Sequence, residues 1–143
     1  MDVKKIVIHR SESPYGNLSV IDKWHRERGF DKVGYHWIVN NCFPTAESWR
    51  DRKPVFDNDG AIEVGRAFGT RGAHVKGYNN ESVGICLIGM RDFTSKQFAS
   101  AVFLIGKILK AYPDAEILGH YELDSNKGDC PSINMDYFRS LLG

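Results

Sequence analysis

The residues of this chain whose types are best suited to chemistry are two histidines in apolar segments and a cysteine in a polar loop. His9 follows the apolar run "KKIVI", and His120 lies in a second run, "ILGHYEL". Cys130 comes ten residues later in a polar loop, just before Pro131. Because loops converge at strand ends in open α/β sheets, these side chains can meet in space. Two imidazoles and a thiolate suit a tetrahedral zinc site with one open position, which is typical of catalytic zinc.

The spacing of these three residues does not by itself decide for a metal. It is not a compact motif such as C-x-x-C, and a chain with five histidines and three cysteines offers such a triplet by chance. Cys42 and Cys86 belong to apolar runs and are expected to be packed hydrophobic residues. We expect His25 and His36 to be structural. On residue types alone, a metal site and three structural side chains both remain open.

Hydrophobic patterning predicts strands that alternate with helices. Short β-branched or aromatic runs predict strands at residues 4–10, 34–40, 61–67, 82–89 and 115–121. Helical spacing predicts helices at residues 18–28, 94–110 and 133–142, and residues 42–60 are interpreted mainly as a loop. Ser19 with Asp22, and Thr94 with Gln97, match the capping-box pattern. The alternation indicates one α/β domain over residues 1–143, with helices packed on a central sheet.

Composition excludes several classes of partner. Nineteen Lys and Arg balance eighteen Asp and Glu, so the net charge of +1 predicts no binding to nucleic acid. No apolar run is long enough to span a bilayer, and we expect no membrane partner. The N-terminus lacks the apolar core of a secretory signal. We therefore expect the protein to be cytoplasmic as synthesised and to act elsewhere only after release or by another export route. We also expect it to be a monomer.

Five segments of the chain resemble, in sequence and in order, the motifs of a known enzyme family. They are "IVIHRSES", "GYHWIV", "GAIEVGR", "RGAHVKGYNNESVGICLIG", and "ILGHYEL" followed by "CPS". Together they make the chain similar to the zinc-dependent N-acetylmuramoyl-L-alanine amidases, which include phage amidase-type lysozymes, bacterial amidases and animal peptidoglycan recognition proteins. The resemblance covers nearly the whole chain. It implies a central mixed sheet of about five strands flanked by helices, with Zn²⁺ in a surface groove.

The resemblance also implies a role for individual residues. The zinc ligands of the family fall on His9, His120 and Cys130, and its catalytic tyrosine falls on Tyr35 in "GYH". The catalytic lysine of the family normally stands two residues before the cysteine. Here the sequence reads "KGDC", which places Lys127 three residues before it. We expect a bulged loop still to deliver this lysine to the site.

Other residues are candidates for supporting roles. His74 and Asn79 match a family segment near the groove, so we expect both to contact substrate. Glu122 lies two residues after His120, and strand alternation predicts that it supports this ligand from the same face. A further hypothesis concerns three side chains of the 42–60 loop, Trp49, Arg50 and Arg52. It states that they contact glycan or the carboxylates of the peptide.

These expectations combine into one function with named alternatives. The chain is expected to be a zinc-dependent hydrolase that cleaves the amide between N-acetylmuramic acid and L-alanine in peptidoglycan, as a phage or prophage endolysin does. A cytoplasmic amidase that recycles muropeptides is an alternative role. A non-catalytic peptidoglycan-binding module of the same fold is a second alternative. A hydrolase that uses Cys130 as its nucleophile is a third.

Overall fold

One mixed sheet organises the molecule, which we describe from a computed structural model covering residues 1–143. The sheet order is β3-β2-β4-β1-β5. The strands are Lys5–Arg10 (β1), Trp37–Val39 (β2), Ile62–Val64 (β3), Ser82–Leu87 (β4) and Glu116–Gly119 (β5). Neighbouring strands are parallel except β2 and β3, which are antiparallel. The predicted α/β domain with a five-stranded mixed sheet is therefore confirmed.

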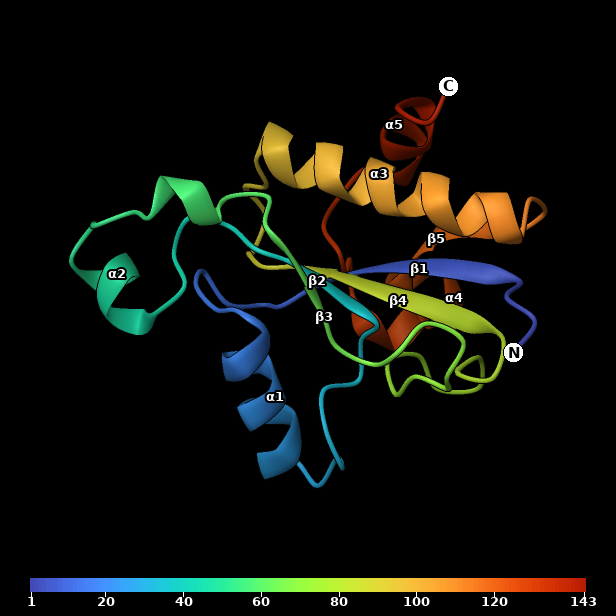
Figure 1. Ribbon diagram of the computed structural model, residues 1–143, viewed down its shortest axis with the longest axis horizontal. Helices are drawn as coiled ribbons and strands as arrows, with labels where there is room; N and C mark the ends of the chain where they lie inside the picture. The colour runs from blue at the N-terminus through green and yellow to red at the C-terminus, as the bar shows by residue number, and fades with distance from the viewer.

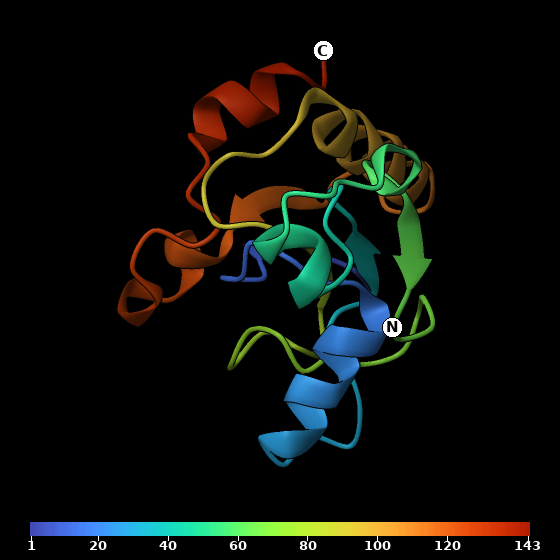
Figure 2. The same ribbon diagram turned by 90° about the vertical axis from the view of Figure 1, so that its left-hand side faces the viewer.

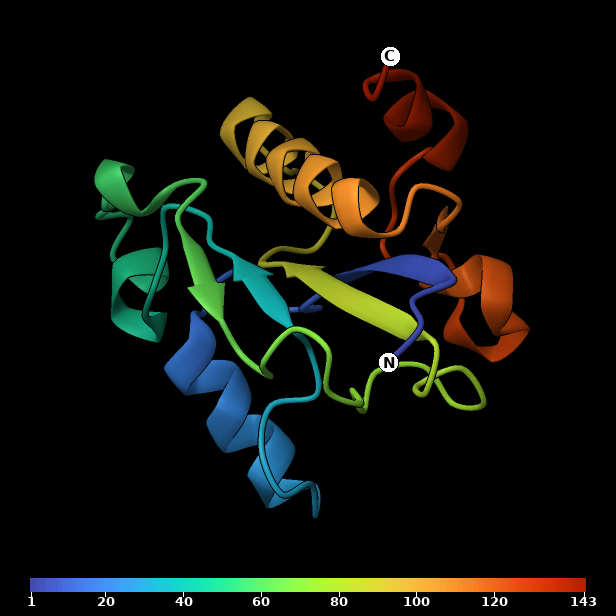
Figure 3. The ribbon, with the colours of Figure 1, turned by 45° about the vertical axis from the view of Figure 1, so that its right-hand side comes forward.

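Helices cover both faces of this sheet. They are Leu18–Glu27 (α1), Ala46–Arg50 (α2), Ser95–Ala111 (α3), His120–Leu123 (α4) and Met135–Ser140 (α5), with 3-10 turns at Phe56–Asn58 (η1) and Ser125–Lys127 (η2). The helices α3 and α5 lie over one face, and α1 lies against the other (Figure 1 and Figure 3). Every strand is shorter than predicted, because several residues at the predicted strand ends turn away from the sheet. No helix has both the length and the apolar character needed to cross a bilayer.

Side-chain caps explain where the two long helices begin. The predicted capping box of α3 is confirmed, because Thr94 and Gln97 each accept the other's backbone N–H. The predicted box of Ser19 and Asp22 is wrong. The helix α1 begins earlier, at Asn17, whose side-chain oxygen accepts the backbone N–H three residues later. Asparagine is as good an N-cap as serine, so the sequence held two competing signals here.

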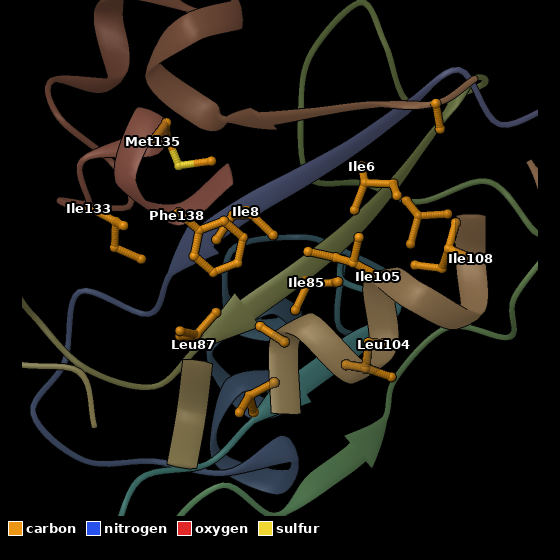
Figure 4. Close-up of a cluster of buried hydrophobic side chains, with 14 of the residues drawn as sticks. Ile6, Ile8, Ile85, Leu87, Leu104, Ile105, Ile108, Ile133, Met135 and Phe138 are labelled. Atoms are coloured by element: carbon orange, nitrogen blue, oxygen red, sulfur yellow. The ribbon is translucent and has the colours of Figure 1, made fainter. Parts of the chain in front are cut away.

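Strand alternation separates a large core from the opposite face of the sheet. Ile8 of β1 and Leu87 of β4 point toward α3 and α5 and pack with Phe138 in the main hydrophobic core (Figure 4). Successive side chains of a strand point to opposite faces. His9 and Cys86, which are paired in the β1–β4 register, therefore lie on the face of the sheet that carries α1. A smaller core on that face contains Ile21, Val33, Ile38, Cys86 and Ile88.

Candidate active site

His9, His120 and Cys130 come together at the end of the β1–β5 strand pair. Their potential ligand atoms all lie within 4.8 Å of one another, and all three side chains are buried. Because β1 and β5 are parallel neighbours, the histidine near the end of β1 lies beside the one that follows β5, with ring centroids 4.5 Å apart. The backbone N–H of Tyr121 donates to the carbonyl of Cys130 at 2.9 Å. This bond holds the returning loop next to the two histidines.

The electrostatics of this cluster suit a borderline divalent cation. Burial lowers the pKa of His9 well below its usual range, with His74 and His120 adding to the shift. Burial also lowers the pKa of His120, with the charge of Lys127 adding, and it raises the pKa of the Cys130 thiol. The Nε2 atom of His120 is buried without a hydrogen-bond partner. A metal ion would satisfy neutral imidazole lone pairs and stabilise the thiolate, so the donor set fits one.

Tyr35 lies against the histidines just before β2. Its ring centroid is 4.9 Å from that of His9 and 5.3 Å from that of His25. Burial raises the pKa of the Tyr35 hydroxyl well above its usual range, and the thiols of Cys86 and Cys130 add to the shift. The hydroxyl therefore stays protonated near neutral pH. It can donate a hydrogen bond to a group that gains negative charge.

Lys127 lies on the wall of the same site, despite the longer spacing to Cys130. It is the last residue of η2, and its carbonyl accepts the backbone N–H of Cys130 at 3.1 Å. Gly128 adopts a positive φ of 58°, a conformation in which the absence of a Cβ avoids a steric penalty. The charge of Lys127 lies close enough to lower the pKa of both His9 and His120.

Asp129 belongs to this lengthened loop, and two arginines pair with it. Its carboxylate pairs with Arg10 at 3.2 Å and with Arg91 at 3.5 Å. The backbone N–H and the charge of Arg10 partly oppose the effect of burial on the pKa of the Cys130 thiol. The residue that follows His9 in β1 thus pairs with Asp129 and lies near the adjacent sulfur.

A groove of about 780 Å³ opens over these residues. Its walls come from the end of α1, from residues 71–79 and from residues 126–130. The helix α1 lies on the side of the sheet opposite α3 (Figure 2). The lining contains Glu12 as its one acid and five basic side chains: Arg10, Arg28, Arg71, Lys76 and Lys127. This charge balance favours ligands that carry carboxylates or other anionic groups.

The groove lining also includes His74 and Asn79, and hydrogen bonds hold both within the protein. His74 Nδ1 lies 2.8 Å from His9 Nε2, and His74 Nε2 lies 3.2 Å from Ser82 Oγ. The Asn79 side-chain oxygen accepts the backbone N–H groups of His74 and Val75 at 2.9 and 3.0 Å. Their predicted contact with substrate stays a prediction, and a supporting role has direct structural evidence.

The role predicted for Glu122 rested on the wrong local structure. The strand β5 ends at Gly119 and α4 begins at His120, so strand alternation does not apply. The Glu122 carboxylate instead accepts the backbone N–H of Gly119 at 2.9 Å and pairs with Arg139 at 2.9 Å. Glu122 thus stabilises the backbone turn that carries His120 and makes no hydrogen bond to the imidazole ring.

The side chains of the 42–60 loop that were hypothesised to contact substrate lie outside the groove. Trp49 and Arg50 belong to α2, Arg52 follows it, and none of the three lines the groove. The guanidinium of Arg52 instead lies over the Trp49 ring, 5.2 Å from its centroid. The position of these side chains gives the hypothesis no support.

His25 lines the groove, although it was expected to be only structural. Its Nδ1 accepts the backbone N–H of Gly34 at 2.9 Å, so it also has the structural role. Burial, with the charge of Arg28 adding, lowers the pKa of His25 to about 4. The signal in the sequence was its position one turn after Ile21 on the buried face of α1.

Comparison with known sequences finds a matching family model and related phage proteins. The sequence model of the family described as N-acetylmuramoyl-L-alanine amidase matches residues 1–133. The endolysin of Escherichia phage T7 is 33% identical over 141 residues, which cover 91% of this chain and 81% of that protein. The endolysin of Enterobacteria phage K11 is 32% identical over 123 residues, which cover 80% of this chain and 69% of that protein.

Solved structures share the fold. The N-acetylmuramoyl-L-alanine amidase LysC from Clostridium intestinale superposes with a TM-score of 0.80 at 22% identity, covering 99% of this chain and 86% of that chain. A variant of Drosophila peptidoglycan-recognition protein LB in complex with tracheal cytotoxin gives a TM-score of 0.70 at 27% identity, covering 91% of this chain and 75% of that one.

Proposed function

The chain belongs to the N-acetylmuramoyl-L-alanine amidase family and is a peptidoglycan amidase, and from this premise we propose that it uses zinc to hydrolyse the amide between N-acetylmuramic acid and L-alanine. The observation that carries the proposal is the convergence of His9, His120 and Cys130 in a groove that also holds Tyr35 and Lys127. The similarity to phage endolysins supports an endolysin role. In this role the enzyme is a monomer, made in the cytoplasm, that reaches the cell wall on release.

The donor set supports the choice of zinc. Zinc binds imidazole nitrogen and thiolate sulfur, whereas magnesium and calcium prefer oxygen ligands. Three protein ligands leave one position open, as in catalytic zinc sites. When bound, zinc lowers the pKa of a water molecule and polarises an amide carbonyl, and hydrolysis of an unreactive amide benefits from both effects.

Tyr35 and Lys127 are suited to stabilise the charge that develops during hydrolysis. Attack on the amide carbon moves negative charge onto the carbonyl oxygen, which then needs a donor or a cation nearby. The protonated Tyr35 hydroxyl supplies a donor, and the Lys127 ammonium supplies a compact positive charge. His9, His120 and Cys130 beside them are buried, and such interactions are stronger in a low-dielectric site.

The remaining groove residues suit a peptide attached to a glycan. Arg28, Arg71 and Lys76 line the groove away from the ligand cluster and offer positive charge to carboxylates of the peptide stem. Trp24 and Phe30 add apolar surface at the α1 wall. A mostly polar, positively charged groove with some aromatic surface matches this class of substrate better than a purely apolar pocket would.

Two alternative functions have less support. A non-catalytic peptidoglycan-binding module has no chemical need for an intact set of His9, His120 and Cys130. A cysteine hydrolase needs an activated thiolate, and reactive cysteines have lowered pKa values. Burial raises the pKa of Cys130, which is the opposite direction. The amidase proposal explains all three side chains.

The products of digested cell walls test the proposed bond. Purified sacculi treated with the zinc-loaded protein are expected to release free stem peptides that begin with L-alanine and to leave the glycan strands uncut. Mass spectrometry of the soluble products distinguishes these peptides from glycan fragments. Release of muropeptides with cleaved glycan, or of peptides cut within the stem, would contradict the proposed specificity.

The Asp129 ion pairs lead to a prediction about metal affinity. Asp129→Ala removes the two contacts that hold the lengthened loop beside Cys130, so we expect zinc affinity to fall by roughly twofold to fivefold, because exposed ion pairs contribute little each. Competition with a chromophoric chelator measures this change. Asp136→Ala, which removes an exposed partner of Arg139 on α5, is the matched control and should leave zinc affinity unchanged. Equal affinities for the two variants would show that the loop holds Cys130 without Asp129.

A further inference from the structure

A row of three buried polar side chains extends from His9 away from the ligand cluster. His9 Nε2 lies 2.8 Å from His74 Nδ1, and His74 Nε2 lies 3.2 Å from Ser82 Oγ. The Ser82 hydroxyl in turn lies 2.8 Å from the carbonyl oxygen of Tyr78. All three side chains are at most 8% exposed. The row therefore ends on a backbone acceptor, the carbonyl of Tyr78, whereas its two histidines also line the groove.

The end of this row determines the position of each proton along it. A carbonyl oxygen only accepts, so the single Ser82 proton goes to Tyr78, and Ser82 Oγ must accept from His74 Nε2. A neutral His74 then has a bare Nδ1, which accepts from His9 Nε2–H. A neutral His9 that is protonated on Nε2 has its lone pair on Nδ1. The row thus leaves the Nδ1 atom of His9 free for the cluster with His120 and Cys130.

Two glycines let the His74 ring pack directly against the backbone. A Cβ atom at Gly84 would come within 2.7 Å of the ring atoms Cγ and Nδ1, and a Cβ atom at Gly72 would lie 2.6 Å from Cδ2. Any larger residue at either position would displace the imidazole. The backbone on either side is fixed as well, because Asn79 accepts the N–H of His74. The ring therefore has little freedom to rotate away from His9.

We propose that His74 and Ser82 are positioning residues that select the His9 tautomer with a free Nδ1 and hold that atom toward the metal. This inference rests on the zinc site of the proposed function. In this view the buried side of the 71–79 loop serves to orient His9. This role explains why two polar side chains, His74 and Ser82, are buried here. Outer hydrogen-bond partners of this kind fix ligand orientation and raise ligand basicity.

Nuclear magnetic resonance tests the proton assignment directly in the folded, zinc-loaded protein. Long-range ¹H–¹⁵N correlation spectra distinguish the two nitrogen atoms of each histidine. We expect His9 to carry its proton on Nε2 and to bind the metal through Nδ1, and we expect His74 to carry its proton on Nε2. A His9 protonated on Nδ1, or a His74 protonated on Nδ1, would overturn the proposal without any substitution.

Substitutions at His74 and Ser82 test the consequence for metal binding. His74→Leu removes the acceptor and should lower zinc affinity by about 10-fold to 100-fold, the usual effect of losing such a partner. His74→Asn retains an oxygen near the position of Nδ1 and should recover most of that loss. Ser82→Ala no longer fixes which nitrogen of His74 carries the proton, and it should produce a mixture of His9 tautomers in the spectrum of the metal-free protein. Unchanged zinc affinity in a folded His74→Leu protein would overturn the proposal. If that variant does not fold, the Ser82→Ala spectrum decides between the outcomes.

His36→Leu is the matched control. His36 is a buried histidine near His74, but its ring nitrogens bond the backbone of Thr70 and Gly84 and do not bond a proposed ligand. Its loss should lower the melting temperature while zinc affinity stays within about twofold, the opposite of a positioning effect.

Stem-peptide release from sacculi is measured separately. A protein with the expected tautomers that releases no such peptides would contradict the proposed function and leave this inference intact.

Discussion

Cys130→Ala is expected to abolish zinc binding and to lower the rate of stem-peptide release by about 10³-fold or more. In the proposed zinc site the thiolate supplies one of three ligands in a buried cluster, and two neutral imidazoles alone would bind the metal far more weakly. Metal activation of water and carbonyl contributes several kcal/mol to such reactions, and each ~1.36 kcal/mol corresponds to a tenfold change in rate. Elemental analysis of the purified variant measures the metal, and product release from sacculi measures the rate.

Cys42→Ala is the control for this substitution. Cys42 is half-buried and lies outside the groove, so its loss should change neither zinc content nor rate. The pair of measurements also separates a zinc ligand from a cysteine nucleophile. A Cys130→Ala protein that keeps one zinc per chain but loses activity would contradict the ligand assignment and favour covalent chemistry. If the metal is essential, the activity of wild-type enzyme that a chelator has inactivated should return fully when zinc is added.

The convergence of His9, His120 and Cys130 was the part of the site that the sequence predicted best, although residue types alone left it open and their role as zinc ligands stays a prediction. His9 and His120 each lie at the end of an apolar run, a pattern that places a residue near the end of a strand. The pattern contains no information on strand order. The two histidines meet because β5 adds beside β1 at the edge of the sheet, and this pairing depends on contacts between distant parts of the chain.

The supporting residues were harder to predict because loops have no periodicity. Glu122 was assigned by strand alternation, yet a glutamate three residues after Gly119 is also the signal for a capped helical turn, and that signal prevailed. A similar signal was present at Thr45 and Ser48, which cap the short helix α2 inside the segment interpreted as a loop. The partnership of His74 with Ser82 depends on the path of the 71–79 loop, which no local pattern describes.

Tyr35→Phe is expected to lower the rate of stem-peptide release by roughly 10²-fold to 10³-fold, the usual effect of losing one donor to a developing oxyanion. The substitution removes one oxygen atom and keeps the ring that packs against His9 and His25. Zinc content and substrate binding should therefore stay close to those of the wild-type protein. Initial rates at several substrate concentrations separate a fall in kcat from a rise in KM, and we expect the change in kcat.

The control for Tyr35→Phe is Tyr15→Phe, which removes the hydroxyl of a half-buried tyrosine that packs on Trp24 and lies outside the groove. Its rate should match that of the wild-type protein. Because burial raises the pKa of Tyr35, its hydroxyl stays protonated as the pH rises through neutrality, so the ratio of wild-type to Tyr35→Phe rates should stay constant between about pH 6 and 9. A ratio near one would mean that the oxyanion is stabilised without this hydroxyl, and Lys127 would then be the remaining side chain in the groove proposed for that task.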